Sequence, residues 1–339
     1  MKFKHHESNR CAEITFRPFC KGDGAEFCRC IQDFYGDGYP YKEYLEESFL
    51  LEKCQSGQML VLCGLTPQGE IVSTSAVRFD EEFTGSGLLL LRVVKEQYRG
   101  MGIGRMQEEH LFEFLEKQGG LSSFYADVMT HNTVSQGSLV RRGFVYCGIR
   151  LMLYRNSIMV PRLPLAKEGK MSQALMCRRQ EVQKTGLIYC PSEHKEAVRS
   201  IYQQLGVECK IQTKGNTPDT VQTILTWKIE KIHHSHIVTV QKIGTDFPSL
   251  LHQKMDIISR QKDATILCYL NIKDPAALYA YELLQQAGFF FTGLKPLQTL
   301  EEYMLLAYIG KQKIRYEDIH LQESGIWLLS YIKEHISYL

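Results

Sequence analysis

The feature that most constrains the fold is an apolar strand pattern followed by a glycine-rich turn and an amphipathic helix pattern. The chain reads "SGLLLLRVV" at 86–94 and "EQYRGMGIGR" at 96–105, and apolar residues then recur at helical spacing as far as Gly119. A strand that is apolar on both faces is typical of the interior of a sheet. Because the helix must bury its apolar face against that sheet, the stretch predicts a layered α/β domain.

The surrounding sequence extends this pattern in both directions. Alternating or β-branched stretches predict strands at 12–19, 58–65, 71–79, 122–130 and 145–154. Amphipathic stretches predict helices at 22–35, 42–57, 103–120 and 132–144. The order is therefore β-α-α-β-β-β-α-β-α-β, which is typical of a mixed α/β sheet.

A later part of the chain repeats the order strand, helix, strand, helix, strand. The repeated strands are "HIVTVQKIG" and "ATILCYLNI", and the last helix ends in "AGFFFTG" as the earlier one ends in "RGFVYCG". The shared pairs Gly143-Phe144 and Gly288-Phe289 are the most specific common mark. We interpret the two parts as a diverged internal repeat, which a chain of 339 residues is long enough to contain.

The composition change at 155–170, with two prolines and weak periodicity, marks a boundary. We expect a first domain at 1–155, a linker at 156–185, a second domain at 186–310 and a helical tail at 311–339. The tail helix around Trp327 is expected to dock on its own chain.

Composition excludes several classes of protein. The formal net charge is +2, which argues against a nucleic-acid-binding surface. The first ten residues lack the apolar run of a signal peptide, and no apolar run is long enough for a membrane helix. Eleven cysteines without a CxxC pair are expected to be reduced thiols in the cytoplasm. "HHSH" (233–236) could bind a metal, but a polar loop is the favoured reading and no metal is expected.

The glycine-rich turn itself allows two interpretations. Glycines permit positive φ, and the free N–H groups at a helix N-terminus attract anions, so the turn could hold a pyrophosphate. A tight strand-to-helix turn is the alternative. The turn lacks the Gly-Lys-Ser/Thr end of a P-loop, and its Gly100-x-Gly102-x-Gly104 spacing differs from the dinucleotide-binding fingerprint.

Arg99-x-x-Gly102-x-Gly104 resembles the R/Q-x-x-G-x-G/A signature of the GNAT N-acetyltransferases. The resemblance covers about residues 12–154 and includes Asn132 and Gly143-Phe144. It implies a GNAT fold, in tandem because of the repeat, and an acetyl-CoA site in the first domain. It also implies that backbone groups around Val93 and Val94 bind the pantetheine arm and that Asn132 hydrogen-bonds the cofactor near its reactive end. Ser135 is counted among the cofactor-binding residues. The residues implied to hold the pyrophosphate are Arg99, Gly100, Met101, Gly102, Ile103, Gly104 and Arg105.

The implied reaction is attack of an uncharged primary amine on the thioester of acetyl-CoA within a ternary complex. Candidate general bases are Asp127 and His131, since histidine titrates near neutrality. Tyr35, Asp37 and Tyr39 fall where the family's substrate loop lies, although a turn packing aromatic side chains explains them as well. The sequence departs from the family at Leu139, where a tyrosine acid is frequent, and at Ser135 and Glu96.

Three functions remain open. The first is an N-acetyltransferase, the second a non-catalytic acyl-CoA-binding sensor or scaffold, and the third an enzyme for a longer acyl group. The acceptor is expected to be an amine on a small molecule or a peptide, and homodimerisation is left open. At the corresponding loop of the second domain, Thr245-Asp246-Phe247-Pro248 replaces the glycines. Asp246 should repel a pyrophosphate and cap a helix, so we expect no cofactor there.

Overall fold

The computed structural model describes residues 13–36, 39, 41–79, 85–156, 169–180, 186–296 and 301–336. The chain forms two compact units, described separately below. Unit 1 comprises Met1–Arg78 with Leu89–Gly119, and unit 2 comprises Phe79–Leu88 with Gly120–Leu339. The chain therefore crosses between the units at three places: at the end of β3 (Ile71–Phe79), within β4 (Ser86–Val94) and after Gly119.

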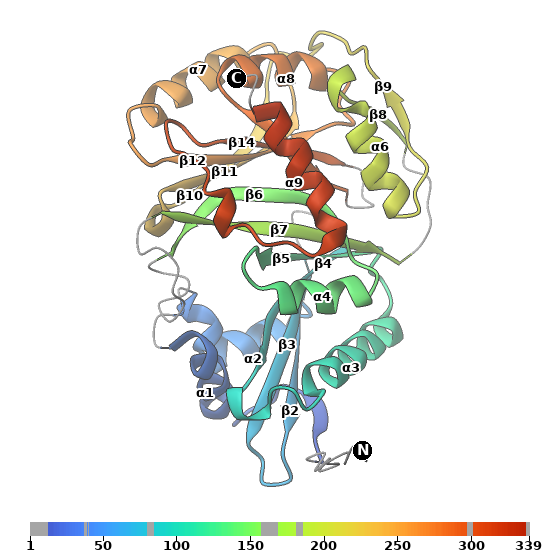
Figure 1. The fold of residues 1–339 in the computed structure, drawn as a ribbon, viewed down its shortest axis with the longest axis vertical. Helices are drawn as coiled ribbons and strands as arrows, with labels where there is room; N and C mark the ends of the chain where they lie inside the picture. Colours follow the sequence, from blue (N-terminus) through green and yellow to red (C-terminus); the bar gives the residue numbers. More distant parts are fainter. Residues whose placement is uncertain are drawn as a thin grey trace, which may run out of the picture. The chain divides into compact units, whose positions relative to one another are not determined.

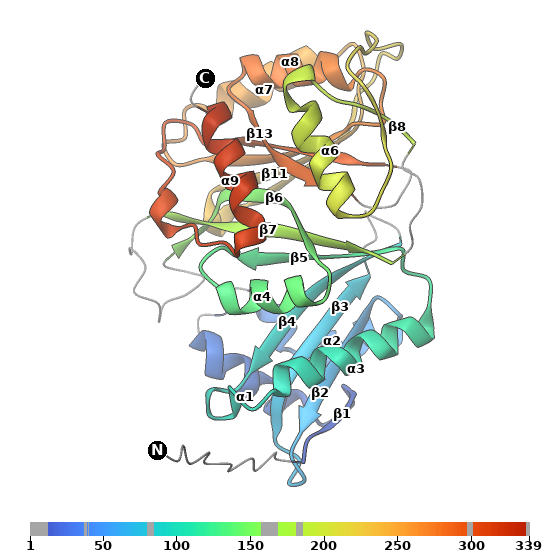
Figure 2. The same ribbon diagram turned by 45° about the vertical axis from the view of Figure 1, so that its right-hand side comes forward.

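Unit 1 contains the antiparallel strands β1 (Thr15–Pro18), β2 (Met59–Leu65) and β3 (Ile71–Phe79), followed by β4. Its helices are α1 (Gly24–Tyr35), α2 (Glu47–Gln55) and α3 (Ile103–Gln118), with 3-10 turns η2 (Lys42–Leu45) and η3 (Glu96–Tyr98). The expected helix at 42–57 is thus divided into η2 and α2. Figure 2 shows α3 on the opposite side of β2 and β3 from α1 and α2.

Two kinds of packing hold the helices of unit 1. Phe27 and Ile31 of α1 are buried in one apolar cluster with Val61 of β2. On the α3 side, the buried Gln107 accepts a hydrogen bond from Ser73 (2.7 Å) and donates one to Ser75 (3.0 Å). Since every buried amide group needs a partner, this polar pairing fixes how α3 sits on the strands.

Unit 2 contains the second half of the chain and the end of the first. Its strands are β5 (Ser123–Met129), β6 (Val145–Arg155), β7 (Lys170–Arg179), β10 (Ile224–Glu230), β11 (Ser235–Lys242), β12 (Thr265–Asn271), β13 (Phe290–Lys295) and β14 (Tyr303–Tyr308). Its helices are α4 (Thr133–Arg141), α6 (Lys195–Gln204), α7 (Phe247–Ile258), α8 (Ala277–Gln286) and α9 (Glu323–Ile336). The short elements are β8 (Leu187–Tyr189), β9 (Lys210–Gln212), η4 (Ser192–His194), η5 (Lys231–His233) and η6 (Tyr316–Asp318).

The sheet of unit 2 contains the same four-strand motif twice. The strands of the second copy lie in the reverse spatial order. The order is β4-β5-β7-β6 and then β13-β14-β12-β11-β10 (Figure 1). The pair β4–β5 is parallel, as is β11–β12, whereas β5–β7, β6–β7, β12–β14 and β13–β14 are antiparallel. The predicted mixed α/β sheet with two similar halves in tandem is therefore confirmed.

The two halves meet where β6 runs antiparallel to β13. Gly148 and Gly293 are the paired residues at this contact. A Cβ atom on Gly293 would lie 2.3 Å from the carbonyl oxygen of Cys147, so only glycine allows this approach. The backbone contact at the centre of unit 2 thus depends on these two glycines.

The Gly-Phe pairs that revealed the repeat have the same backbone role in both halves. Gly143 and Gly288 end α4 and α8 with φ of 79° and 91°, in the left-handed region that favours glycine. The N–H of Phe144 then donates to Leu139 and that of Phe289 to Leu284, at 3.1 and 3.0 Å. Each phenylalanine is buried, so the shared mark is a helix end that turns the chain into the core.

One strand lies where the sequence indicated a linker. β7 occupies 170–179, within the linker expected at 156–185, and pairs with both β5 and β6. Its residues from Met171 to Cys177 are buried on both faces, so its pattern does not alternate clearly. The prolines that suggested a boundary lie in 157–168, outside the described residues.

The tail helix α9 docks on its own chain, as predicted. It contacts β6 and β13, and α6 lies beside it on the same strands (Figures 1 and 2). Leu328 and Ile332 of α9 are fully buried. None of the helices in the described part of the chain has the length and apolar character needed to cross a membrane.

Candidate functional site

The loop between β4 and α3 has the backbone geometry of a helix N-terminus that is built from glycine. Gly100 and Gly102 have φ of 80° and 77°, and Gly102 is the N-cap of α3. No atom lies within 4 Å of the Cβ position at either glycine, so they are required by backbone conformation and not by crowding. Both glycines and Met101 are exposed.

The backbone N–H groups from Gly100 to Gly104 have no hydrogen-bond acceptor among the described residues of the chain. The first N–H groups that are bonded are those of Arg105 and Met106, which both donate to Gly102. The first turn of α3 also lacks an acidic residue. Unpaired amides at the positive end of a helix dipole attract an anion, so the loop fits a phosphate group.

The two arginines of the loop are held differently. The Nε of Arg99 donates to the carbonyl of Val94 (3.0 Å), and its guanidinium lies 5.3 Å from the ring centre of Phe34. Arg105 pairs with Glu109 one turn further along α3 (3.0 Å). Arg99 therefore closes the loop against the end of β4, whereas Arg105 is a surface residue.

Strand β4 carries, at Leu91, a backbone feature that the sequence did not reveal. Leu91 has φ of 52°, in the left-handed region, and its carbonyl accepts a hydrogen bond from Thr74 (2.7 Å). Such a conformation costs about 1–3 kcal/mol at a residue other than glycine. Val93 is buried beyond this kink and Val94 is half-buried, and the backbone roles assigned to them remain predictions.

The aromatic segment after α1 forms a continuous row of rings. The ring centres of Tyr35 and Tyr39 are 4.8 Å apart, and those of Tyr39 and Tyr41 are 5.9 Å apart. The row continues to Tyr44 and Phe49. Burial raises the pKa of both Tyr35 and Tyr39, so neither phenol is a ready acid at neutral pH. This favours the packing interpretation of the segment. Asp37 lies outside the described residues.

The remaining candidate residues lie in unit 2, around the turn from β5 to α4. Asn132 is the N-cap of α4, and its Oδ1 accepts the N–H of Ser135 (3.0 Å). Among the described residues its Nδ2 group has no partner. Because Oδ1 is used by the cap, Asn132 presents a hydrogen-bond donor, and Ser135 takes part through its backbone.

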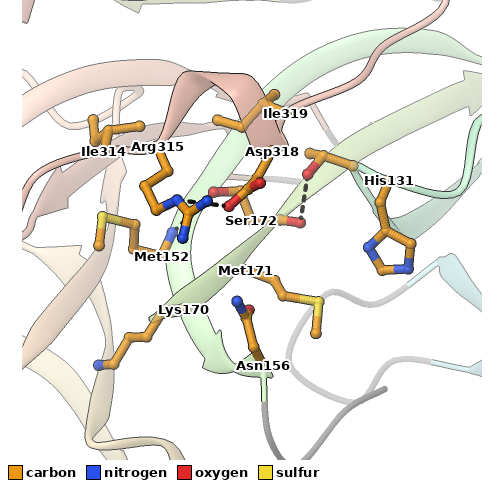
Figure 3. A pocket seen from close by; sticks show the side chains of 11 residues that line it. His131, Met152, Asn156, Lys170, Met171, Ser172, Ile314, Arg315, Asp318 and Ile319 are labelled. Carbon is orange, nitrogen blue, oxygen red and sulfur yellow. Dashed lines mark hydrogen bonds and ion pairs between the residues drawn. The ribbon is translucent and has the colours of Figure 1, made fainter. Parts of the chain in front are cut away.

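His131 lines a small pocket next to this turn. The pocket has a volume of about 20 Å³, which holds about one water molecule. Figure 3 shows His131 on one side and the ion pair of Arg315 with Asp318 on the other. Burial lowers the pKa of His131 below its ordinary value, and His320 adds to this. The imidazole is therefore neutral at pH 7 and can accept a proton.

Asp127 on β5 is engaged in an ion pair. Its carboxylate contacts the guanidinium of Arg150 on β6, which is 6% exposed. Breaking a buried ion pair of this kind would leave an uncompensated charge. The geometry therefore favours His131 over Asp127 as a base, and both assignments remain predictions. Leu139 is 1% exposed and part of the apolar core, so it supplies no acid.

The corresponding loop of the second half, between β11 and α7, is covered by another segment of the chain. The N–H groups of Thr245 and Asp246 donate to Thr220 (2.9 Å) and Val221 (3.2 Å). A Cβ atom on Gly244 would lie 2.6 Å from the backbone nitrogen of Thr223. These amides are therefore not available to an anion.

Asp246 holds that covering segment in place. Its Oδ1 accepts both the N–H (2.8 Å) and the hydroxyl (2.6 Å) of Thr223. It stands at the N-cap of α7, but its side chain makes no cap hydrogen bond, so the expected capping role was wrong. The carboxylate binds the covering segment, which precedes β10, instead of the helix.

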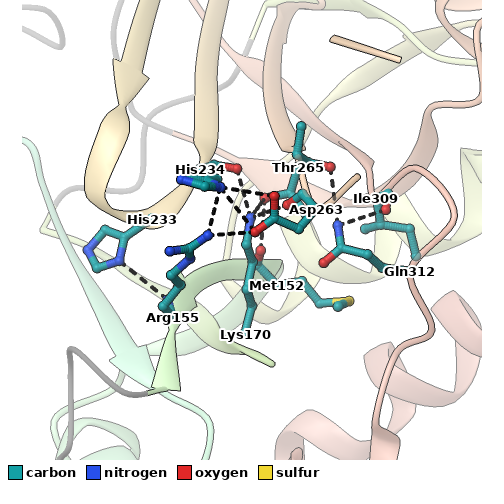
Figure 4. A network of polar contacts seen from close by, with 10 residues as sticks. Met152, Arg155, Lys170, His233, His234, Asp263, Thr265, Ile309 and Gln312 are labelled. Carbon is teal, nitrogen blue, oxygen red and sulfur yellow. Dashed lines mark hydrogen bonds and ion pairs between the residues drawn. The ribbon is translucent and has the colours of Figure 1, made fainter. Parts of the chain in front are cut away.

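The histidines at 233–236 have separate structural roles. His233 accepts the N–H of Arg155 (3.3 Å), and His236 accepts the indole N–H of Trp227 (3.0 Å). His234 contacts Asp263, which pairs with Arg155 at 2.7 Å (Figure 4). No cluster of three metal-ligating side chains is found among the described residues.

Lys170, which lies between the pocket and this network, is committed to three acceptors. Its ammonium donates to the carbonyls of His234 (2.8 Å) and Asp263 (2.7 Å) and to the hydroxyl of Thr265 (3.0 Å) (Figure 4). Burial lowers the pKa of Lys170 to about 8. The network joins the β6–β7 pair to the second half and is structural in character.

Comparison with known proteins identifies the first part of the chain. Residues 26–144 match the model of the acetyltransferase (GNAT) family. None of the curated proteins compared matches the chain. The solved structures it resembles include the ribosomal-protein-S18-alanine N-acetyltransferase from Escherichia coli, with 19% identity, a TM-score of 0.38, and coverage of 48% of this chain and 92% of that one.

Two further structures have similar values. A GNAT-family acetyltransferase from Streptococcus pneumoniae has 20% identity and a TM-score of 0.41, with coverage of 49% and 98%. A GCN5-related N-acetyltransferase from Kribbella flavida has 16% identity and a TM-score of 0.39, with coverage of 49% and 97%. The family assignment of residues 26–144 rests on the match to the family model.

Proposed function

We propose that this chain, whose residues 26–144 belong to the GNAT acetyltransferase family, is an N-acetyltransferase that moves an acetyl group from acetyl-CoA to a primary amine. The observation that carries the proposal is the loop before α3. Its amides from Gly100 to Gly104 are unpaired among the described residues, and its glycines hold positive φ. A pyrophosphate bound there would satisfy these donors.

Residues of the chain can be given roles on this basis. The amides of Gly100 to Gly104 and the nearby Arg105 bind the pyrophosphate, and Arg99 fixes the loop to the end of β4. The backbone around Val93 and Val94 receives the pantetheine arm. The Oδ1 of Asn132 is used to cap α4. Its Nδ2 group can therefore donate a hydrogen bond to a carbonyl oxygen of the cofactor.

Acetyl-CoA supplies the thioester whose carbonyl carbon the acceptor amine attacks, so that the C–N bond forms as the C–S bond breaks. His131 takes a proton from the amine, because its lowered pKa keeps the imidazole neutral at pH 7. Attack within a ternary complex needs no covalent enzyme intermediate, so positioning is the main contribution of the protein. Leu139 offers no proton for the departing thiolate, which takes one from solvent, since the pKa of a thiol is about 8.5.

The acceptor is assigned only as an amine on a small molecule or a peptide. We place the protein in the cytoplasm because its cysteines within the described ranges are free thiols. For the chain as a whole we propose one acetyl-CoA site, in the domain at 1–155, and a second domain at 186–310 without one.

The test is release of free thiol from acetyl-CoA by the full-length protein over a broad panel of amines. Thiol release that depends on both acetyl-CoA and an amine is expected. A protein that does not bind acetyl-CoA would contradict the proposal.

The alternative function is a non-catalytic acyl-CoA-binding sensor or scaffold. It is favoured by the buried Leu139 at the position of the family's acid and by the ion pair that engages Asp127. Acetyl-CoA binding without turnover of any amine would support it. Comparing acyl-CoA chain lengths in the same assay decides whether a longer acyl group is preferred.

A further inference from the structure

The segment 320–322, in the second half of the chain, crosses over the turn between β5 and α4. The N–H of His320 donates to the carbonyl of Thr130 (3.1 Å). The Nε2 of Gln322 donates to the carbonyl of Thr133 (2.9 Å). The segment is therefore bonded on both sides of His131 and Asn132.

The side chain of Gln136 in α4 forms hydrogen bonds both to the turn and to this segment. It is fully buried, and its Nε2 donates to the carbonyls of Thr130 (3.1 Å) and His320 (3.1 Å). Its Oε1 accepts the hydroxyl of Tyr146 (2.7 Å) and the N–H of Gln322 (3.3 Å). A buried network in which each group has a partner is rigid, because any displacement leaves a polar atom unpaired.

The network is anchored to the core by α9. Tyr146 of β6 is 1% exposed, and a Cβ atom on Gly325 would lie 2.9 Å from its ring. The helix that begins beside Gln322 thus packs directly on the ring whose hydroxyl enters the network. This docking fixes where residues 320–322 lie over the turn.

The residues just before this segment face the candidate base. Ile314, Arg315, Asp318 and Ile319 line the pocket that also contains His131 (Figure 3). The same stretch of chain therefore bonds the turn and forms a wall opposite its histidine.

From these contacts we infer that residues 320–322 are a clamp through which the second half positions Asn132 and His131 of the first. Gln322 is the positioning residue, since its side chain donates to the carbonyl of Thr133, the first residue of α4 and the neighbour of Asn132. The inference rests on the proposed function for the roles of Asn132 and His131. It gives the second half a task that needs no cofactor of its own.

The test compares Gln322→Ala with Glu323→Ala in the full-length protein. Glu323 is the neighbouring residue, begins α9 and is exposed, which makes it a matched control. Hydrogen exchange reports on the Ser135 N–H, which is bonded to Asn132. Loss of one hydrogen bond should speed this exchange about 5-fold in Gln322→Ala.

A second measurement is the Kd for acetyl-CoA by calorimetry at a temperature where the variant is fully folded, and this Kd should rise about 5-fold in Gln322→Ala. The control Glu323→Ala should leave the exchange rate of the Ser135 N–H and the Kd for acetyl-CoA unchanged. Gln322→Glu keeps the length of the side chain but loses the donor to Thr133, so it should behave like the alanine variant.

Three results separate the possible failures. An unchanged exchange rate of the Ser135 N–H in Gln322→Ala would overturn the clamp, whether or not the protein is an acetyltransferase. Faster exchange with unchanged affinity and unchanged turnover would overturn its role in positioning the site. Absence of acetyl-CoA binding by the wild type would refute the proposed function, and with it the positioning role.

Discussion

The two strand–loop–helix turns of this chain have the same place in the sheet motif. They differ in whether the backbone N–H groups of the loop are hydrogen-bonded. In the turn before α3 the N–H groups from Gly100 to Gly104 have no acceptor among the described residues. In the turn before α7 the segment Thr220–Thr223 covers the loop and accepts its N–H groups. The comparison teaches that the motif alone does not make an anion site. What decides is whether another part of the chain occupies the amides.

The strands next to these turns differ in a related way. β11 and β12 pair without interruption from Ser235 to Val240. The pairing of β4 with β5 covers Ser86 to Leu88. Continuous pairing uses the backbone groups of β11 that face β12, so they are not available to a ligand.

The largest effect should come from a carboxylate placed at the first loop. Gly102→Glu puts a negative side chain at the N-cap of α3 and forces a residue other than glycine into φ of 77°. We expect the affinity for acetyl-CoA to fall at least about 100-fold, measured by calorimetry.

The matched control is Thr245→Glu, which puts the same side chain on the exposed loop before α7. It should leave the affinity unchanged. Equal loss of affinity in the two variants would break the comparison between the loops.

His131→Gln tests the second residue after β5. The second half has Lys273 as the second residue after β12. The variant should lower kcat about 100-fold or more at pH 7 with little change in acetyl-CoA affinity. Only the neutral imidazole accepts a proton, so wild-type activity should fall as the pH drops through the lowered pKa of His131, below about 6.5. A pH–rate profile of the variant that keeps this acidic limb would exclude His131 as the base.

Asn132→Asp separates the cap of α4 from the donor. Aspartate caps a helix as well as asparagine does, so the free energy of unfolding should change by less than about 0.5 kcal/mol. Its carboxylate cannot donate, so the affinity for acetyl-CoA should fall about 10-fold.

The counterpart in the second half is Asp274, which accepts the N–H groups of Ala276 and Ile243. Asp274→Asn should leave the affinity for acetyl-CoA unchanged in the same titration. Unchanged affinity in Asn132→Asp would show that its Nδ2 group does not contact the cofactor.

The smallest effect on binding is expected for Asp246→Ala. This change removes the acceptor of Thr223 and loosens the segment that covers the second loop. The free energy of unfolding should fall by about 1–3 kcal/mol in denaturant titrations, while acetyl-CoA binding stays the same. Weaker binding at the first site would contradict the separation of the two loops.

Sequence patterns predicted the elements where local signals were strong. The apolar run before Glu96, the glycines of the loop and the Gly-Phe helix ends each have a local physical cause, and each was found as expected. The strand β7 was missed, because a strand buried on both faces next to a proline-rich stretch does not alternate.

Other features could not be read from sequence because they depend on contacts between distant residues. The kink at Leu91 and the φ of 50° at Met152 occur at residues with no preference for them. The pairing of Asp246 with Thr223 and of Gln136 with Gln322 joins parts of the chain that no local pattern relates. Glutamine in α4 gave no signal of its role, although a polar residue among apolar neighbours is a reason to look for a partner.

The most direct test of the central claim is the stoichiometry of acetyl-CoA binding to the full-length protein. The account predicts one molecule per chain in a calorimetric titration, abolished by Gly102→Glu and unaffected by Thr245→Glu. Two molecules per chain, or one that survives Gly102→Glu and is lost in Thr245→Glu, would contradict it.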